Sequence, residues 1–337
     1  MAGRGISNVS KRVLWCWPIL PSQMGTRIPP DIEIVPFGGA QGELGRAALD
    51  VSAVLVRRGY QIDQAVIEQT GSLEFVQRAG TNCQNIDLRA ARVAGVRVAA
   101  WPMHIDVSVA EHALLMMLGL ARKVIEGDRA VRSGAYHDLG LTPVQTDEST
   151  TATNWMGYPA IPTLFGRTLG VVGFGEIGQL LAIRAASLGM RVLYSQRRPL
   201  ASPNGTVAAT YVALDDLLAQ SDFVSLHVPL TVETTGLVNA AFLGKMQRSA
   251  FLVNASRGPV IDEQSLVLAL AQGQIAGAGL DVFGWEPLQP DSPLATAPNT
   301  LLSPHVASGT DIGTDLAGLI GNIARALQGG EFAYQRA

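Results

Sequence analysis

The sequence predicts an α/β protein built from parallel sheets with helices on both faces. Its 337 residues suffice for about two domains of roughly 150 residues each. Short apolar runs alternate with helix-like stretches through the first hundred residues, and a second such series begins at Thr168. This alternation is typical of parallel sheets covered by helices. A glycine-rich turn near the start of the second series favours a dinucleotide-binding sheet there.

Composition excludes several classes of protein. Hydrophobic residues make up 47% of the chain, far more than a disordered chain carries. The net charge of −3 offers no basic surface for nucleic acid or anionic lipid. Two cysteines, Cys16 and Cys83, cannot form a disulfide framework, and no Cys/His cluster has zinc spacing. We therefore predict a cytoplasmic protein with no metal, no nucleic-acid partner and no membrane partner.

The first series of strands begins after two basic residues, Lys11 and Arg12. A signal peptide can start in this way, but the apolar stretch Val13–Leu20 contains Pro18 and no small-residue cleavage site follows it. We therefore interpret this stretch as a strand. Apolar runs bounded by turn residues predict strands at Arg12–Trp17, Ile32–Pro36, Ala53–Val56, Leu73–Arg78 and Val96–Ala100, with helices such as Gln61–Gln69 and Asp87–Ala94 between them.

A long apolar helix separates the two series. Ser108 and Glu111 have the S-x-x-E spacing of a capping box and predict its start. The apolar run Ala113–Ala121 is shorter than the roughly 20 residues that a spanning helix needs. Because the helix is apolar on nearly every side, we expect it to be buried between domains. The next stretch, Tyr136–Thr163, predicts a long loop that is functional or reaches a partner.

The second series repeats the alternation of strands and helices. Its expected strands are Leu169–Gly173, Arg191–Tyr194, Phe223–Val228, Phe251–Asn254, Ala278–Val282 and Thr300–Ser303. Its expected helices include Ile177–Leu188, Leu214–Ala219, Ala240–Met246 and Glu263–Ala271. The final segment, Asp311–Gln328, is apolar on one face and predicts a further helix.

The glycine-rich turn is the sharpest motif in the chain. Gly173, Gly175 and Gly178 form G-x-G-x-x-G directly after an apolar strand and at the start of a helix. In this motif the first glycine permits a tight turn, the second lets the backbone approach a pyrophosphate, and the third lets helix and strand pack closely. The helix N-terminus offers unpaired N–H groups to the phosphates. The motif therefore predicts dinucleotide binding.

The position that reads the ribose carries no carboxylate. An acidic residue about 20 residues after the turn normally accepts hydrogen bonds from the ribose hydroxyls. Here that place holds Ser195, followed by Arg197 and Arg198. A missing carboxylate removes repulsion of a 2′-phosphate, and guanidinium groups pair with phosphate. We predict NADP(H) as the preferred cofactor and leave NAD(H) use open; an ordinary Arg-rich surface loop is the alternative.

Further polar residues follow the expected strands. His227, Asn254, Asp281 and His305 lie at or just beyond strand ends, and Arg257 follows Asn254. Open α/β sheets bind ligands beyond the carboxyl ends of their strands. We expect the set to line a site, although each residue alone also fits a structural or solvated role.

With these motifs in this order, the chain resembles the D-isomer-specific 2-hydroxyacid dehydrogenase family, which includes glyoxylate/hydroxypyruvate reductases and phosphoglycerate dehydrogenases. The matching motifs are Gly80–Asn82, Ile86–Asp87, Val109–His112, the glycine-rich turn, Ser221–Leu230, Asn254–Gly258, Asp281–Pro287 and Ser303–His305. The resemblance implies a Rossmann dinucleotide-binding domain, residues 107–307, inserted into a flavodoxin-like α/β substrate domain, residues 1–106 and 308–337. The active site would lie in the interdomain cleft.

The resemblance also implies roles for individual residues. His305 would donate a proton to the developing alkoxide, Glu286 would stabilise its imidazolium form, and Arg257 would bind the substrate carboxylate and polarise the keto oxygen. Backbone N–H groups at Thr81 and Asn82 would hold the other side of the carboxylate. The implied cofactor-binding residues are Gly173, Gly175, Glu176, Ile177, Gly178, Ser195, Arg197, Arg198, His227, Val228, Pro229, Thr234, Ala255, Ser256 and Asp281.

These roles predict an oxidoreductase that transfers hydride between NADP(H) or NAD(H) and a small 2-keto or D-2-hydroxy acid. An NAD-dependent phosphoglycerate-type dehydrogenase and a non-enzymatic dinucleotide-sensing protein of the same fold are the alternatives. We also expect a homodimer in which Tyr136–Thr163 crosses to the partner and Trp155 approaches the partner's substrate pocket, the alternative being that Trp155 packs on its own domain. Trp101 and Trp285 depart from the family pattern and either shape the substrate pocket or merely pack.

Overall fold

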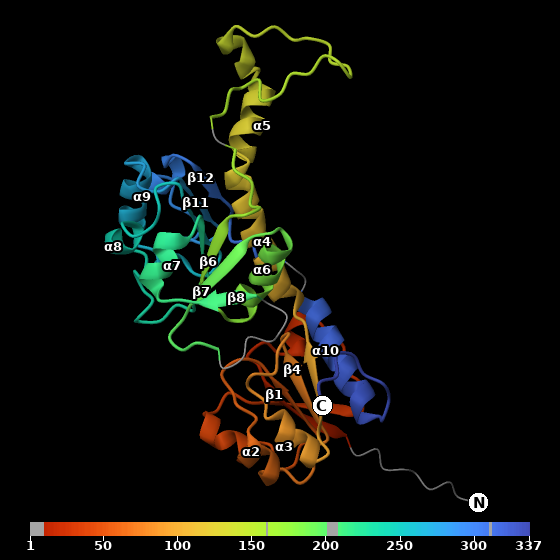
Figure 1. Cartoon of the computed structure of the whole chain (residues 1–337). Helices are drawn as coiled ribbons and strands as arrows, with labels where there is room; N and C mark the ends of the chain where they lie inside the picture. Colours follow the sequence, from red (N-terminus) through yellow and green to blue (C-terminus); the bar gives the residue numbers. More distant parts are fainter. Residues whose placement is uncertain (1–9, 160, 201–207, 310–311) are drawn as a thin grey trace, which may run out of the picture. The chain divides into compact units, whose positions relative to one another are not determined.

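Parallel strands build both halves of the protein. The computed structural model describes residues 10–159, 161–200, 208–309 and 312–337. The chain divides into two units, one made of the residues up to Val107 and from Gly309 on, the other of Ser108–Ser308 (Figure 1). Each unit holds one sheet in which all neighbouring strands are parallel. The predicted α/β class is confirmed.

The sheet of the first unit has the order β2-β1-β3-β4-β5. Its strands are β1 Lys11–Cys16, β2 Ile32–Pro36, β3 Ala53–Val56, β4 Phe75–Ala79 and β5 Arg97–Trp101. This is the strand order of flavodoxin-like sheets, as the family resemblance implies. The stretch that could have begun a signal peptide is a strand, which ends at Cys16.

Both faces of this sheet are covered by helices. The helices are α1 Leu44–Ala47, α2 Gln64–Gln69, α3 Leu88–Val93 and α10 Ile312–Leu327, with 3₁₀ turns at Pro21–Met24 and Gln41–Glu43. Val13 and Trp15 of β1 lie in a buried cluster with side chains of α10, whereas Leu14 and Cys16 lie in a cluster with residues of α2 and α3. Strand side chains alternate between faces, so one strand supports two cores.

The long helix α4 begins earlier than the sequence predicts. It spans His104–Ala121, so Ser108 and Glu111 lie inside it and the capping box predicted there is wrong. Its N-terminal cap is the buried carboxylate of Asp315, which accepts hydrogen bonds from the backbone N–H groups of His104 (3.0 Å) and Ile105 (3.3 Å). A carboxylate satisfies N–H groups that have no partner within the helix. The cap comes from a residue 211 positions away from His104 in the sequence.

α4 also passes a membrane-helix test that rests on length and composition alone. Its 18 residues have a mean hydropathy of 1.3, and half of the stretch is buried inside the protein. The core helix of a folded domain passes the same test, so this result is weak evidence for a membrane segment. The expectation that α4 is buried on nearly every side is wrong in detail. Met116 and Met117 are fully buried, whereas Leu115 and Leu118 are exposed. Its place between domains and the cytoplasmic location stay predictions.

The sheet of the second unit has seven strands in the order β12-β11-β10-β9-β6-β7-β8. They are β6 Thr168–Val172, β7 Arg191–Ser195, β8 Ala209–Tyr211, β9 Phe223–Leu226, β10 Phe251–Asn254, β11 Gly277–Leu280 and β12 Thr300–Leu302. Counted from β6, the order contains the 3-2-1-4-5-6 arrangement of the Rossmann fold and one further strand. The edge strand β8 was not predicted; with three residues it is too short for a recognisable pattern.

The helices of the second unit follow the predicted positions closely. They are α6 Glu176–Ser187, α7 Leu214–Gln220, α8 Ala240–Leu243 and α9 Glu263–Ala271, with 3₁₀ turns at Gly258–Val260 and Pro293–Thr296. An unpredicted helix, α5 Val124–Ser133, continues into a 3₁₀ turn at Ala135–Leu139. Figure 1 shows α5 and the segment after it extending away from the second sheet. On that segment Trp155 contacts Tyr136 edge to face, with ring centroids 5.7 Å apart.

Candidate active site

The polar residues that follow the strands of the second unit gather at one edge of its sheet. β7 ends at Ser195 and β10 at Asn254, while Asp281 directly follows β11 and Ser303 directly follows β12. Parallel strands end at the same edge, where open α/β sheets bind their ligands. The structure therefore brings the predicted residues of this unit to the edge where a ligand is expected.

The glycine-rich turn needs glycine for two different reasons. Gly173 has a φ of +90°, and a Cβ there would lie 2.6 Å from the carbonyl oxygen of His227. A Cβ on Gly178 would lie 2.5 Å from the carbonyl oxygen of Gly173, so α6 packs directly on the turn. Gly175 is the N-cap of α6, whose first-turn N–H groups have no partner within the helix. This bare backbone at a helix N-terminus fits a pyrophosphate.

The ribose end of this site contains a residue that the sequence did not single out. Ser195 is buried, and its carbonyl oxygen accepts a hydrogen bond from the N–H of Gly173 at 2.9 Å. Gln196 accepts a hydrogen bond from the N–H of Phe174 through Oε1 (3.3 Å) and donates to the carbonyl of Arg198 through Nε2 (2.7 Å). The side chain of Gln196 thus ties the glycine-rich turn to the arginine pair. In the sequence, the only indication of this role was that Gln196, an amide residue, directly follows the end of strand β7.

The two arginines at the ribose end are exposed. A hydrogen bond from Thr231, a backbone hydrogen bond and the charge of Arg197 together lower the pKa of Glu233. Arg197 is therefore near enough for its charge to act on an acidic residue of the loop that follows β9. Two further expected cofactor residues, Glu176 and Ile177, begin α6. Others lie on the loops after β9 and β10; they are His227, Val228, Pro229, Thr234, Ala255 and Ser256.

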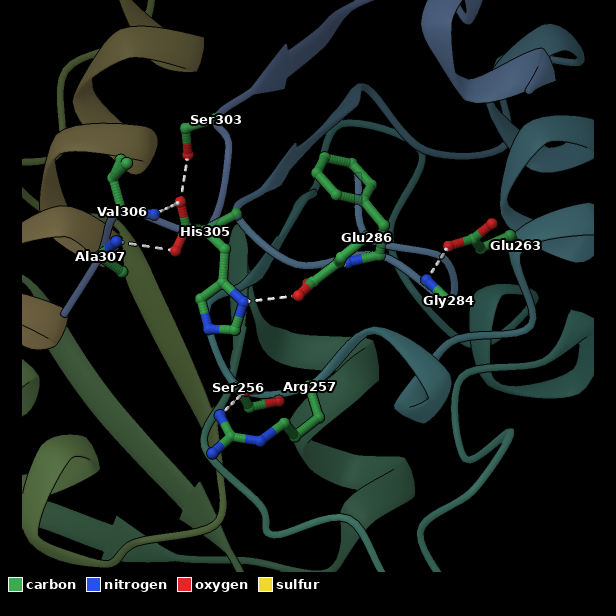
Figure 2. Close-up of polar contacts among 11 residues, drawn as sticks. Ser256, Arg257, Glu263, Gly284, Glu286, Ser303, His305, Val306 and Ala307 are labelled. Carbon is green, nitrogen blue, oxygen red and sulfur yellow. Dashed lines mark hydrogen bonds and ion pairs between the residues drawn. The ribbon is translucent and has the colours of Figure 1, made fainter. Parts of the chain in front are cut away.

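His305 and Glu286 form a hydrogen-bonded pair. Nδ1 of His305 lies 2.7 Å from Oε2 of Glu286, and Oε1 of Glu286 accepts a hydrogen bond from the N–H of Phe283 at 3.0 Å (Figure 2). Burial alone would raise the pKa of Glu286. The hydrogen bonds from His305 and Phe283, with the charges of His305 and Arg257, outweigh burial and lower the pKa of Glu286 below its usual value. The carboxylate is therefore held in its ionised form, which stabilises a protonated imidazole.

Arg257 lies close enough to this pair for its charge to act on Glu286. The buried side chain of Asn254 shapes the turn that carries Arg257, because it donates to the carbonyl of Arg257 (3.0 Å) and accepts from the N–H of Ser256 (3.0 Å). Figure 2 shows the second imidazole nitrogen of His305 on the side of the ring that faces Arg257. An imidazole nitrogen and a guanidinium therefore face the same side of the candidate site.

Asp281 holds the loop that carries His305. It is fully buried, and its carboxylate accepts hydrogen bonds from the N–H groups of Val306 (2.9 Å) and Ala307 (2.8 Å) and from the hydroxyl of Ser303 (2.5 Å). The backbone carbonyl of Asp281 accepts from the N–H of His305 at 2.8 Å. His305 has a φ of +53°, which a non-glycine residue rarely adopts. Both carboxylate oxygens of Asp281 thus accept hydrogen bonds from within the chain. The expected contact of Asp281 with the cofactor stays a prediction.

Two cavities lie at different edges of the second sheet. A cavity of about 520 Å³ at the His305–Glu286 pair is lined by Phe283, Glu286, Pro287, Leu288, Leu302, Ser303, Pro304 and His305. A cavity of about 390 Å³ includes Arg167, Phe223 and Phe251, which lie at the amino ends of β6, β9 and β10. Because ligands of such sheets bind at the carboxyl ends, the first cavity belongs to the candidate site. Within the described ranges no cluster of His, Cys, Asp or Glu could hold a metal ion.

The expected substrate-binding residues of the first unit lie on the turn after β4. Gly80 donates its N–H to the carbonyl of Trp101 at 2.7 Å, and the side chain of the buried Asn82 accepts from the N–H of Gln84 at 3.3 Å. Trp101 packs against α10 within its own unit, where a Cβ on Gly318 would lie 2.3 Å from the indole. Trp285, in contrast, is 70% exposed next to Glu286.

Comparison with known proteins agrees with this architecture. The family model described as D-isomer specific 2-hydroxyacid dehydrogenase, NAD binding domain, matches residues 114–307. A glyoxylate reductase of Korarchaeum cryptofilum is 40% identical over 253 residues, which cover 74% of this chain and 71% of that protein. A D-3-phosphoglycerate dehydrogenase of Archaeoglobus fulgidus is 34% identical over 298 residues, which cover 87% of this chain and 53% of that protein.

Solved structures show the same likeness. The crystal structure of a glyoxylate reductase from Paecilomyes thermophila has a TM-score of 0.55 at 28% identity, covering 97% of this chain and 98% of that one. The holo form of D-mandelate dehydrogenase from Rhodotorula graminis has a TM-score of 0.57 at 25% identity, also covering 97% and 98%.

The Rossmann sheet and the site at its carboxyl edge define an oxidoreductase that uses a nicotinamide dinucleotide. The chain belongs to the D-isomer specific 2-hydroxyacid dehydrogenase family. It is an enzyme that transfers hydride between its dinucleotide and a 2-keto or D-2-hydroxy acid. The relatives therefore favour the predicted enzyme over the alternative of a non-enzymatic dinucleotide-sensing protein.

The hydrogen bonds of Asp281 lead to a testable expectation. Asp281→Asn removes a charged acceptor from the loop of His305, and each such bond is worth about 1.5–3 kcal/mol. We expect kcat to fall about tenfold or more, while the Kd of the reduced dinucleotide stays nearly unchanged. Steady-state kinetics and fluorescence titration measure the two quantities, with Ser303→Ala as the milder variant. A weakened Kd with normal kcat would instead assign Asp281 to cofactor binding.

Proposed function

We propose that the enzyme reduces glyoxylate and similar small 2-keto acids to 2-hydroxy acids, with NADPH as the preferred donor. The observation that carries this proposal is the 2.7 Å contact between His305 and Glu286 beside Arg257. Relatives named glyoxylate reductase, at 40% and 38% identity, support the substrate class.

In the proposed mechanism the residues of this chain bind the keto acid and supply one proton. A bound reduced nicotinamide supplies the hydride. Arg257 pairs with the substrate carboxylate and polarises the keto oxygen. As the new C–H bond forms at the keto carbon, the carbonyl electron pair moves to oxygen, which takes the proton from Nε2 of His305. Glu286 keeps its hydrogen bond to Nδ1 and stabilises the imidazolium before transfer. Thr81 and Asn82 are proposed to bind the carboxylate through backbone N–H groups.

A phosphoglycerate-type dehydrogenase is the second candidate. Relatives of that name are 34% and 33% identical to this chain, which spans about half of their length. Because the similarity extends over 87% and 88% of this chain, a phosphorylated substrate is included among those to be assayed.

The catalytic roles are tested by substitution at His305. His305→Asn should lower kcat for 2-keto acid reduction about 10²–10⁴-fold, because the general acid is removed. Arg257→Lys should raise KM and lower kcat together, since one ammonium cannot copy the fork of a guanidinium. The assay uses glyoxylate, hydroxypyruvate, pyruvate and phenylpyruvate, with 3-phosphoglycerate and NAD in the reverse direction. Near-normal turnover in His305→Asn, or activity confined to 3-phosphoglycerate, would refute the proposal.

The cofactor preference is tested at Arg197. A guanidinium contact to the 2′-phosphate is worth about 1.5–3 kcal/mol, so Arg197→Ala should lower kcat/KM for NADPH about tenfold or more and leave NADH unaffected. The negative charge of Glu233 lies near Arg197 and would repel a bound 2′-phosphate, so Glu233→Gln should strengthen the NADPH preference. Arg89→Ala, an exposed arginine of the first unit, is the control. A wild-type preference for NADH would show that this loop does not read the phosphate.

We further propose that the enzyme is a homodimer joined through α5 and the segment after it. We call α5 and the segment after it, residues 124–159, the arm. Large apolar side chains are exposed along it: Val124, Ile125, Val131, Leu139, Leu141, Val144 and Trp155. A soluble monomer seldom leaves so many apolar side chains in water on one segment. A second copy of this chain would bury them, whereas Trp155 already contacts Tyr136 of its own arm.

Dimerisation is tested on α5. Val131→Glu places a charge in the proposed interface, and burying that charge unpaired costs several kcal/mol. Light scattering should give the mass of two chains for the wild type and of one chain for Val131→Glu. Val93→Glu, at a valine of the first unit that is even more exposed than Val131, should remain a dimer. A wild-type monomer at micromolar concentration would contradict the proposal.

A further inference from the structure

We propose that Glu263 is a positioning residue for the reaction, because it fixes the loop that presents Glu286 to His305. This inference rests on the proposed catalytic roles of Glu286 and His305. Glu263 does not touch His305 or the expected substrate; it is proposed to act through the backbone of Gly284, two residues before Glu286.

The contact is a short hydrogen bond between a helix start and a loop. The backbone N–H of Gly284 donates to Oε1 of Glu263 at 2.6 Å (Figure 2). Glu263 is the first residue of α9, where a carboxylate is also favoured by the helix dipole. Glu263 is half-buried, while Gly284 and the bond itself are exposed to solvent.

The same loop is held from a second direction. A Cβ on Gly258 would lie 1.9 Å from the carbonyl carbon and oxygen of Phe283 and 2.5 Å from the nitrogen of Gly284. The turn that carries Arg257 therefore packs directly on this backbone. Gly258 and Glu263 belong to one short segment, which contacts the loop from both of these positions.

The position of the loop decides where the carboxylate of Glu286 lies. One oxygen of Glu286 accepts from the N–H of Phe283 and the other is 2.7 Å from Nδ1 of His305. Phe283 is adjacent to Gly284, so a shift of this backbone moves the donor that orients Glu286. The segment 257–263 thereby sets Arg257 and the His305–Glu286 pair relative to each other.

Two substitutions separate the hydrogen bond from the charge. Glu263→Gln loses the negative charge but keeps an oxygen at the same reach, which still accepts from Gly284. Glu263→Asp keeps the charge but is one methylene shorter and withdraws the acceptor. If the hydrogen bond positions the loop, Glu263→Gln behaves like the wild type and Glu263→Asp does not. If only charge matters, the order is reversed.

The readout is the pH dependence of kcat/KM for glyoxylate reduction with NADPH. Loss of the Glu286 charge destabilises the imidazolium, so Glu286→Gln moves the alkaline limb of the profile to lower pH. Glu263→Asp should move it in the same direction and lower kcat about tenfold, with dinucleotide Kd unchanged. Glu263→Gln and the neighbouring Gln264→Ala, an exposed residue of the same helix, should keep the wild-type profile.

A double variant tests whether Glu263 acts through Glu286. In the Glu286→Gln background, Glu263→Asp should produce no further shift of the profile. An unchanged profile in Glu263→Asp, a shift in Glu263→Gln as large as in Glu263→Asp, or a full additional shift in the double variant would each overturn the inference. If His305→Asn and Glu286→Gln themselves leave turnover intact, the proposed function fails and the inference falls with it. If they impair turnover and Glu263→Asp does not, the inference alone fails.

Discussion

The arrangement of the active site depends on one buried carboxylate, that of Asp281. A buried charge is costly unless several donors satisfy it, and here two backbone N–H groups and a serine hydroxyl do so. All three donors come from the segment that carries His305. The carboxylate therefore holds the histidine in a left-handed backbone conformation that costs of order 1–3 kcal/mol. From that conformation the imidazole reaches Glu286.

The rest of the site is built by close contacts between backbones rather than by long side chains. At Gly173 and at Gly258 no Cβ fits, because a neighbouring loop passes within contact distance. Each of these loops follows a strand of the parallel sheet, so the sheet sets their starting points and the glycines set their spacing. The side chains of Asn254, Gln196 and Glu263 then stabilise the individual turns by hydrogen bonds to their backbone groups. A rigid framework of this kind positions catalytic groups well.

Periodic elements were predictable from the sequence, and tertiary contacts were not. Strands such as Ala53–Val56 and helices such as Glu263–Ala271 agree with their patterns, because burial on a sheet produces a local signal. The start of α4 was misplaced because Asp315, a residue near the other end of the chain, caps it. Motif matching brought Arg257, Glu286 and His305 together by family resemblance. It could not reveal Gln196 or the contacts of Asp281, since both depend on loops that meet only in the folded chain.

The cluster shared by β1 and α10 has a consequence for biosynthesis. The first sheet emerges early from the ribosome, but Leu316, Leu319 and Ile320, which cover one of its faces, are translated after the whole second unit. Domains commonly fold in the order in which they are made. Here the Rossmann unit can complete its core while the strands translated before it still expose an apolar face. We therefore expect the Rossmann unit to mature before the first unit, whose early strands keep an apolar face uncovered until α10 is made.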